Sequence, residues 1–340
     1  MPDIVRVFLV KPAFMSRPPH ITFLLPRPRV FGAQRWDAVL MKRLGQGDVH
    51  HVAAGRMAQL ARHFQLPGDA ATWPLAALSR QAQAGDAGDA LWLRADPAWM
   101  VVDINGVRLL GVGERLQLTQ AEADALEATL TPLFAENGLF FDWPTPAAAW
   151  LRLSPESSAE SLPQFADPAD ALGDDVFEHT DTRPQARQWR MLAGEIQMLL
   201  HGHPVNQARQ ARGLPPVNAL WFWGAGVLPQ EALTTRHALT YAEDSRIMTL
   251  AKITGTAQPM LQQFAIPKGD ALFDFSHLRD AKALQEAWLM PALAALKHGQ
   301  IASLALDSED GCRLQLTRGQ GLRFWRKSWA WPQEQQDSTE

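Results

Sequence analysis

The stretch from residue 201 to residue 226, H-G-H-P-V-N-Q-A-R-Q-A-R-G-L-P-P-V-N-A-L-W-F-W-G-A-G, constrains the fold of this chain more than any other. It surrounds a short run of large apolar side chains with histidine, asparagine, arginine, proline and glycine. Before it, apolar residues between 189 and 200 recur at helical spacing, which predicts a helix with one buried face. After Pro216, the run 218–223 predicts a buried strand that ends in a glycine turn. We therefore expect a helix, a polar loop and a strand, with the loop facing a ligand.

His201 and His203 are the candidate metal ligands of this stretch. In a strand, residues two positions apart point to one face, so both imidazoles would reach one ion. In a helix, the two side chains diverge. Pro204 favours an extended conformation at His203, which keeps the shared-face geometry open. The structural alternative is a pair of hydrogen-bonded histidines that shape the end of a helix.

Asn206 and Arg209 are candidate ligand-binding residues because they are three positions apart, which places them on one face of a helix. The planar guanidinium of arginine binds carboxylate or phosphate groups, and an asparagine beside it both donates and accepts hydrogen bonds. Together they form a site for a small anion. The structural alternative is that Arg209 pairs with an acidic residue elsewhere and that Asn206 caps the turn.

The strand that follows adds Asn218, Trp221 and Trp223 to the candidate ligand-binding residues. A tryptophan has a large apolar face and one N–H donor, so it suits a pocket as well as a core. Gly224 and Gly226 would allow backbone amides to approach a ligand. Close packing of a helix on the strand explains both glycines equally well.

Strands and helices are mixed along the whole chain, which predicts an α/β fold with a mixed sheet flanked by helices. Residues 246–254 fit either a strand or a short helix. Predicted strands are 4–10, 21–25, 91–94, 99–103, 107–110, 147–153, 270–275, 300–306, 312–318 and 322–326, and predicted helices are 36–44, 52–64, 119–135, 184–200 and 278–297.

Three segments of different composition suggest the domain organisation. We expect an N-terminal α/β segment over residues 1–90, which is either separate or part of the main domain. An α/β core over 91–330 contains the 201–226 stretch. The polar residues 331–340 are expected to form a disordered tail.

Composition excludes several classes of protein. A net charge of −4 and a pI near 6.2 give no general electrostatic reason to bind nucleic acid. Cys312 is the single cysteine, so neither an intrachain disulfide nor a cysteine metal cluster can form, which fits a cytoplasmic protein. No apolar run approaches the ~20 residues that span a bilayer, so we expect no membrane partner.

Basic and aromatic residues do interleave near the end of the chain, which suits either nucleic-acid binding or a solvated strand face: Arg313, Arg318, Arg323, Phe324, Trp325, Arg326, Lys327 and Trp329.

Residues 199–226, L-x-H-x-H-P-V-N-x-x-R-x-x-x-G-L-P-P-V-N-x-L-W-F-W-G-x-G, resemble a bacterial family of RpfE-type regulatory proteins. The resemblance extends to R-A-D-P at 94–97, D-x-N-G-x-R-L-L at 103–110 and A-L-G-D-D-x-F-E-H at 171–179. It covers most of the chain from about residue 90. The regulatory label of the family refers to its gene neighbourhood of pathogenicity-factor regulation, so it implies a role and no chemistry.

The segment 203–226 is also similar to H-P-V-N-x-x-R-x-x-x-G-x-P-x-A-N-x-x-x-x-x-G-x-G of the archaeal-type, cofactor-independent phosphoglycerate mutases. Asp96-Pro97 resembles part of their upstream T-D-P-V-A motif, which makes Asp96 a candidate ligand-binding residue. Asp274 and His277 resemble the ends of their D-x-x-G-H metal motif, with Ser276 in place of the glycine. The resemblance implies an alkaline-phosphatase-like α/β fold, two divalent metals and a serine nucleophile.

The departures from the mutase pattern concern its metal centre. The first strands lead to Lys11-Pro12 and Pro26-Arg27, where the mutases have D-G-x-x-D, and residues 306–309 (L-D-S-E) replace a late G-D-H motif. Phosphoryl transfer at such a centre needs several carboxylates and histidines around two metals. We therefore expect a pseudoenzyme: a non-catalytic regulatory protein, without a cofactor, that binds a small anionic or phosphorylated ligand or a protein partner.

Two other functions remain open from the sequence. The first is a phosphoglycerate mutase or phosphohydrolase that depends on divalent metals held in a rearranged site. The second is a regulator that binds nucleic acid through the basic and aromatic residues near the end of the chain.

Overall fold

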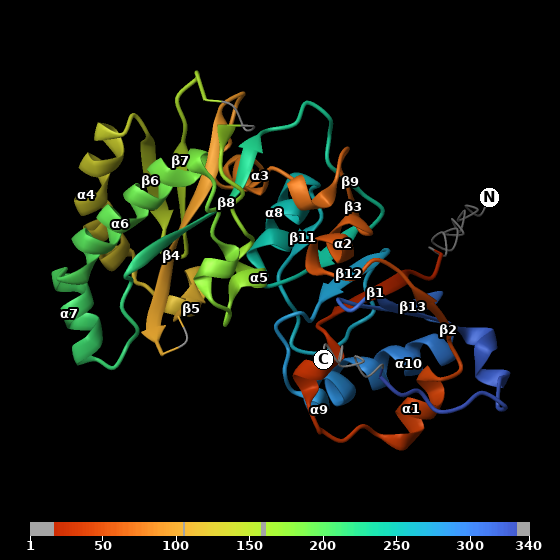
Figure 1. Ribbon diagram of the computed structural model, residues 1–340. Helices are drawn as coiled ribbons and strands as arrows, with labels where there is room; N and C mark the ends of the chain where they lie inside the picture. Colours follow the sequence, from red (N-terminus) through yellow and green to blue (C-terminus); the bar gives the residue numbers. More distant parts are fainter. Residues whose placement is uncertain (1–16, 105, 158–160, 332–340) are drawn as a thin grey trace, which may run out of the picture. The chain divides into compact units, whose positions relative to one another are not determined.

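A computed structural model describes residues 17–104, 106–157 and 161–331 (Figure 1). The strand predicted at 4–10 and almost all of the predicted tail lie outside these residues. The chain divides into two compact units. The first comprises Met1–Phe64, Thr235–Ala251 and Gly255–Glu340, and the second comprises Gln65–Thr234 and Lys252–Thr254. The boundary expected near residue 90 lies within the second unit.

The first unit contains a mixed sheet of seven described strands in the order β11-β10-β12-β1-β13-β14-β2. The strands are β1 (His20–Leu25), β2 (Asp48–His51), β10 (Leu239–Tyr241), β11 (Ala257–Gln258), β12 (Ala271–Asp274), β13 (Ser303–Ser308) and β14 (Cys312–Thr317). The first five in the sheet order are parallel, and β14 and β2 are antiparallel. Leu24 is in register with both Asp274 and Asp307, so these two carboxyl groups lie on one face at the carboxyl edge of the sheet.

The two faces of this sheet differ in polarity. Phe23, Phe273 and Leu306 belong to a hydrophobic core that also contains buried side chains of α1, α9, η7 and α10. The opposite face carries Asp274 and Asp307. The helices of this unit are η1 (Pro28–Phe31), α1 (Ala38–Leu44), α2 (Arg56–Ala61), α8 (Ser245–Ile253, of which the last two residues belong to the second unit), α9 (Ala281–Leu284), the π-helical turn η7 (Gln285–Leu289), α10 (Met290–Lys297) and η8 (Arg318–Leu322).

The second unit is built on an antiparallel sheet in which β4 pairs with β5, β7 and β8, and β6 pairs with β7. The strands are β4 (Leu91–Asp103), β5 (Gly106–Val112), β6 (Phe140–Thr145), β7 (Ala148–Arg152) and β8 (Ala219–Val227). The two-residue strands β3 (Phe64–Gln65) and β9 (Thr234–Thr235) pair with each other.

Helices cover both faces of this second sheet. Buried leucines of α4 (Gln120–Glu136) and α6 (Arg187–His201) share a core with β4, β7 and β8, while α3 (Leu75–Ala84) contributes to a separate core with Trp92 and Trp150 (Figure 1). The remaining helical segments are η2 (Ala70–Thr72), η3 (Gly113–Leu116), α5 (Pro168–Ala171), η5 (Val176–His179), η6 (Pro184–Ala186) and α7 (Pro204–Ala211).

The structure confirms the predicted α/β class with a mixed sheet and flanking helices. It also confirms the helix that begins after Thr119, whose hydroxyl and Glu122 form a capping box. Residues 246–254, for which the sequence allowed a strand or a short helix, lie almost entirely in helix α8. No helix among the described residues is long and apolar enough to cross a bilayer.

Several local predictions are wrong. The strand break at Asp96-Pro97 is absent, because β4 continues through residues 95–97, where it pairs with β8 alone between the end of β7 and the start of β5. A proline is tolerated where one edge of a strand is unpaired. The strand predicted at 322–326 is absent, since η8 and an irregular segment occupy this part of the chain.

Two predicted helices differ from the observed ones. The helix predicted at 52–64 is limited to the short α2, and Phe64 already belongs to β3. The long helix predicted at 278–297 begins at Ala281 and contains the π turn η7 directly before Pro291, which has no amide hydrogen to donate.

Candidate functional site

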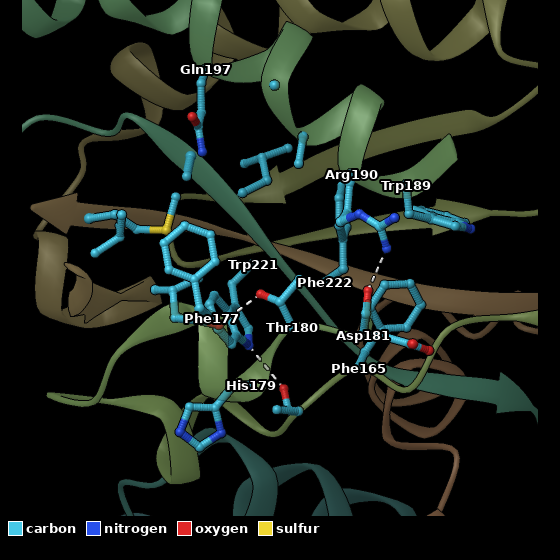
Figure 2. Close-up of a pocket in the computed structure, with 18 of the residues that line it drawn as sticks. Phe165, Phe177, His179, Thr180, Asp181, Trp189, Arg190, Gln197, Trp221 and Phe222 are labelled. Atoms are coloured by element: carbon cyan, nitrogen blue, oxygen red, sulfur yellow. Dashed lines mark hydrogen bonds between the residues drawn. The ribbon is translucent and has the colours of Figure 1, made fainter. Parts of the chain in front are cut away.

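The second unit contains a cavity of about 480 Å³ lined by α6, by β8, by loop residues within 163–166 and by the segment 176–181 that includes η5, with further side chains from β4 and β5. This volume is in the range of sites that bind small molecules. Figure 2 shows the aromatic side chains that line it: Phe165, Phe177, Trp189, Trp221 and Phe222. Phe165, Trp189 and Phe222 pack edge to face, with ring centroids 5.2 to 6.0 Å apart.

One face of α6 forms a side of this cavity. Arg190, Gly194, Gln197 and His201 follow one another at intervals of three or four residues, which places them on the same face of the helix. At Gly194, no heavy atom lies within 4 Å of the position that a β-carbon would take. The helix therefore leaves space at its middle, with a guanidinium near its start and an amide and an imidazole near its end.

Arg190 brings a positive charge to the cavity (Figure 2). Its Nη1 donates to the carbonyl oxygens of Asp181 at 2.6 Å and Arg183 at 3.3 Å. The Asp181 carboxylate pairs with Arg183, whose guanidinium holds the pKa of Asp181 well below its usual range. No carboxylate in the described part of the chain forms an ion pair with Arg190. Its charge is therefore available to an anionic ligand.

Hydrogen bonds fix the loop wall of the cavity. Trp221 Nε1 donates to the carbonyl oxygen of Ala166 at 2.9 Å, and the Thr180 hydroxyl donates to the carbonyl oxygen of Val176 at 2.7 Å. The backbone N–H of Gln164 donates to the Asp181 carboxylate at 3.0 Å. These hydrogen bonds connect the segments of the wall to one another and to β8.

Of the site residues predicted from the sequence, His201, Asn218 and Trp221 line the cavity. His201 is exposed at the end of α6, and its ring makes no hydrogen bond within the described residues. The Asn218 amide donates to the carbonyl oxygen of Met100 at 2.7 Å and accepts from its N–H at 2.8 Å. Asn218 therefore also extends the pairing of β4 with β8.

The two predicted histidines do not share a face. His201 lies in α6, whereas His203 is the N-cap of α7 in an extended conformation. The Nδ1 atom of His203 accepts from the N–H of Val205 at 3.2 Å, and Nε2 lies 3.0 Å from the Thr129 hydroxyl. Burial lowers the pKa of His203, which favours the neutral form of its ring.

Asn206 and Arg209 make their hydrogen bonds inside the protein. Asn206 donates to the carbonyl oxygens of Leu200 at 2.8 Å and Val217 at 2.7 Å, and accepts from the N–H of Val217 at 2.8 Å. It thereby ties the end of α6 to the segment before β8. The fully buried guanidinium of Arg209 donates to three acceptors: the carbonyl oxygens of Pro215 and Leu116 and the carboxylate of Glu122. The ion pair with Glu122 is the structural alternative stated above, in which Arg209 pairs with an acidic residue elsewhere in the chain.

Asp96 and Trp223 belong to a buried network on the face of β4 that packs against α3. The Asp96 carboxylate accepts from Arg94 Nε at 2.9 Å and from Trp223 Nε1 at 2.8 Å. The Arg94 guanidinium lies over the rings of Trp150 and Trp223, 4.7 and 5.2 Å from their centroids. Burial raises the pKa of Asp96, and the neighbouring Arg94 opposes that shift.

Gly224 and Gly226 allow α3 to pack closely on β8. A β-carbon at Gly226 would lie 2.4 Å from the Cβ of Pro74, and one at Gly224 would lie 3.2 Å from the backbone nitrogen of Ala76. Gly224 also has a φ of +68°, a conformation that favours glycine. Helix packing, rather than contact with a known ligand, is therefore the observed use of both glycines.

The two candidate metal ligands of the first unit have different partners. Asp274 is fully buried and accepts from Arg56 Nη2 at 3.2 Å and from the N–H and hydroxyl of Ser276, each at 3.1 Å. His277 is exposed and lies 3.4 Å from a carboxylate oxygen of Glu243. Within the residues that the structure describes, no three His, Cys, Asp or Glu side chains converge to hold a metal ion.

Asp307 is at the centre of a cluster that the sequence did not predict. Arg62 donates to its two carboxylate oxygens, at 2.6 and 3.0 Å, and His63 Nε2 lies 2.9 Å from Oδ2. The Nδ1 atom of His63 lies 3.1 Å from Nε2 of His237. Burial lowers the pKa of both histidines, that of His237 to about 3. Arg62 and His63 are adjacent, but His237 and Asp307 come from distant segments, so no spacing in the sequence relates the four residues.

The sequence did contain a signal for Arg190, Gly194 and Gln197. They recur at helical spacing on α6, as do the apolar residues that predicted its buried face. This second face is interrupted by Gly194, and helical spacing alone does not distinguish one side of a ligand site from a solvated face.

The chain is distantly similar to cofactor-independent phosphoglycerate mutases. It is 34% identical over 62 residues to the 2,3-bisphosphoglycerate-independent phosphoglycerate mutase of Methanothrix thermoacetophila, a match to 18% of this chain and 16% of that protein. It is 32% identical over 65 residues, 19% of this chain, to a probable mutase of the same name from Geobacter sulfurreducens, again matching 16% of the relative. The chain thus spans about one sixth of the length of these relatives. No family model matches it.

Two solved structures are similar over a larger part of the chain. The cofactor-independent phosphoglycerate mutase of Thermoplasma acidophilum aligns with a TM-score of 0.38 and 14% identity, covering 89% of this chain and 90% of that one. A protein of Pyrococcus horikoshii aligns with a TM-score of 0.43 and 11% identity, covering 89% and 88%.

Proposed function

We propose that this protein binds a small molecule in the cavity of its second unit and performs no catalysis there. The observation that supports this most strongly is Arg190, a cation without a carboxylate partner in the described chain, beside aromatic walls. A ligand with a flat apolar body and one negative charge fits both features, because rings stack on aromatic side chains and guanidinium binds carboxylate or phosphate. Gln197 and His201 supply further polar contacts near the other end of α6.

The contacts of the acidic residues support the non-catalytic part of the proposal. A two-metal phosphoryl-transfer centre needs carboxylates and histidines directed at common points. Asp274 instead bonds Arg56 and Ser276, and His277 lies beside Glu243. These donor sets do not fit the divalent metals that the mutase resemblance implies.

We further propose a regulatory role of the RpfE type, in the cytoplasm, with a protein partner as the recipient of the signal. The supporting observation is that the motifs of that resemblance coincide with the cavity. Its 171–179 motif contributes Phe177 and His179, and its 199–226 motif contributes His201 and residues 218–222. Binding of the ligand would then be the event that the partner detects.

A steric substitution tests whether ligand binds in this cavity. Gly194→Leu adds a side chain to the open space on α6 at a helical position, where a larger residue is compatible with the backbone. We expect an aromatic acid found by a thermal-shift screen to raise the Tm of the parent protein and to lose at least tenfold in affinity with Gly194→Leu.

The matched control is Gly202→Leu. Gly202 follows the same helix, also has open space around it and does not line the cavity. Its variant should bind as the parent does. Equal binding by Gly194→Leu and the parent, or no response to any anionic aromatic compound, would exclude this site.

A second candidate function is a metal-dependent phosphoglycerate mutase or phosphohydrolase. The local similarity of 34% to a named mutase is the observation that favours it. It requires bound divalent metal and turnover of 3-phosphoglycerate or another phosphoester, which the proposed function does not.

A further inference from the structure

Helix α2 lies across the carboxyl edge of the parallel strands in the first unit. Its Gln59 donates to the carbonyl oxygens of Leu25 at the end of β1 (3.1 Å) and of Asp307 in β13 (2.6 Å). Gln59 is fully buried, and Arg56 Nη1 donates to its side-chain oxygen at 2.8 Å. The helix is thus fixed to the ends of two adjacent strands.

The two arginines at the ends of α2 neutralise the two carboxylates of this edge. Arg56 begins the helix and lies 3.2 Å from Asp274, and Arg62 caps it and lies 2.6 Å from Asp307. Both carboxylates are 0% exposed. A buried carboxylate that lacks a counter-charge is strongly destabilising, so a cation is required at each position.

The oxygens of both carboxylates are already used. Arg62 donates to Oδ1 and Oδ2 of Asp307, and His63 shares Oδ2. On Asp274, Oδ1 accepts from Arg56 and from the N–H of Ser276, while Oδ2 accepts from the Ser276 hydroxyl. A divalent ion would have to displace the Arg62 guanidinium from Asp307, and on Asp274 it would compete with the hydrogen bonds from Arg56 and Ser276.

We propose that Arg56 and Arg62 are fixed cations that take the place of divalent metal ions at this edge, so that the first unit folds and remains folded without metal. Their charge is supplied by the chain itself. The sheet therefore assembles without a bound metal ion. This does not depend on which ligand the second unit binds.

A charge-compensation experiment on the full chain tests this inference. Arg62→Ala leaves Asp307 buried without its guanidinium, and we expect the Tm to fall by roughly 10 °C. Adding Asp307→Asn removes the uncompensated charge and should recover at least half of that loss. If Arg62→Ala does not fold, the double variant should still be recovered as folded protein.

Two controls accompany these variants. Arg27→Ala removes another arginine near this edge, partly exposed and paired with Glu309, and should lower the Tm by less than about 3 °C. Treatment of the parent protein with EDTA, or addition of Mn²⁺, should leave its Tm unchanged. A fall in the Tm of the parent with EDTA, or a double variant no more stable than Arg62→Ala, would overturn the inference.

Discussion

At the scale of single residues, buried arginines organise this chain by bonding groups that burial would otherwise leave unsatisfied. Arg209 is the clearest case, because its guanidinium bonds two backbone carbonyls and Glu122 at zero exposure. Arg94 and Arg62 play comparable parts for Asp96 and Asp307. A sequence shows the arginines and the acids, but their pairing depends on contacts between distant segments.

Substitutions of Arg209 and Arg212 should show that a buried arginine stabilises the fold more than an exposed arginine that pairs with the same carboxylate. Arg209→Met leaves two buried carbonyls without their donor and removes the buried one of the two guanidiniums that bind Glu122, and we expect a loss of about 3–5 kcal/mol in the free energy of unfolding. Arg212 also pairs with Glu122 but is 51% exposed, so Arg212→Ala should cost less than about 1 kcal/mol. Urea denaturation measures both losses. Similar values would contradict the role assigned to Arg209.

The buried histidines predict a pH dependence of stability. Burial lowers the pKa of His237 to about 3, with His63, Arg236 and Arg313 acting in the same direction. The unfolded chain binds a proton near pH 6.5 and the folded chain does not, so this contribution is present above pH 6.5 and is lost as the pH falls towards 3.

The expected slope is up to about 1.4 kcal/mol per pH unit for this histidine. His237→Gln should make the decline of the free energy of unfolding between pH 6.5 and 5 shallower, as urea denaturation at several pH values would show. The exposed His298→Gln is the control. An unchanged slope in His237→Gln would show that this imidazole is protonated in the folded protein.

At the scale of elements, the 201–226 stretch has the predicted helix before it and the predicted strand at its end, but the expected polar loop contains a second helix, α7. Local pattern suffices for the predicted helix and strand, because periodicity, proline and glycine act within a few residues. It did not reveal that Asn206 and Arg209 brace the module while α6 and β8 line the cavity. That distinction depends on which face of α6 meets the loops, which tertiary packing decides.

Close packing of α3 on β8 gives a prediction for Gly224. Gly213 and Gly224 have similar positive φ values, so alanine should cost about 1–2 kcal/mol at either through backbone strain. At Gly224 the new methyl group also meets Leu75 and Ala76 at 3.2 to 3.3 Å, whereas Gly213 has open space. We expect Gly224→Ala to lose a further ~1–3 kcal/mol of unfolding free energy. Equal losses for the two variants would argue against tight packing here.

At the scale of the whole molecule, the sequence predicted the class of fold. It did not predict which distant segments of the chain form each unit. Mixed helix and strand patterns predicted an α/β protein, as observed. The first unit, however, joins segments far apart in the chain, such as His20 and Asp270, whose backbone and side chain hydrogen-bond at 2.7 Å. The carboxyl edge with Asp274 and Asp307 exists only after β12 and β13 align on β1.

We propose that this chain, although distantly similar to cofactor-independent phosphoglycerate mutases, has no divalent-metal centre for phosphoryl transfer. Metal content of the purified protein, measured after incubation with Mn²⁺ and Zn²⁺ and removal of free ions, tests this most directly. We predict well below one divalent ion per chain and no turnover of 3-phosphoglycerate. Two tightly bound divalent ions per chain, accompanied by turnover, would contradict the account.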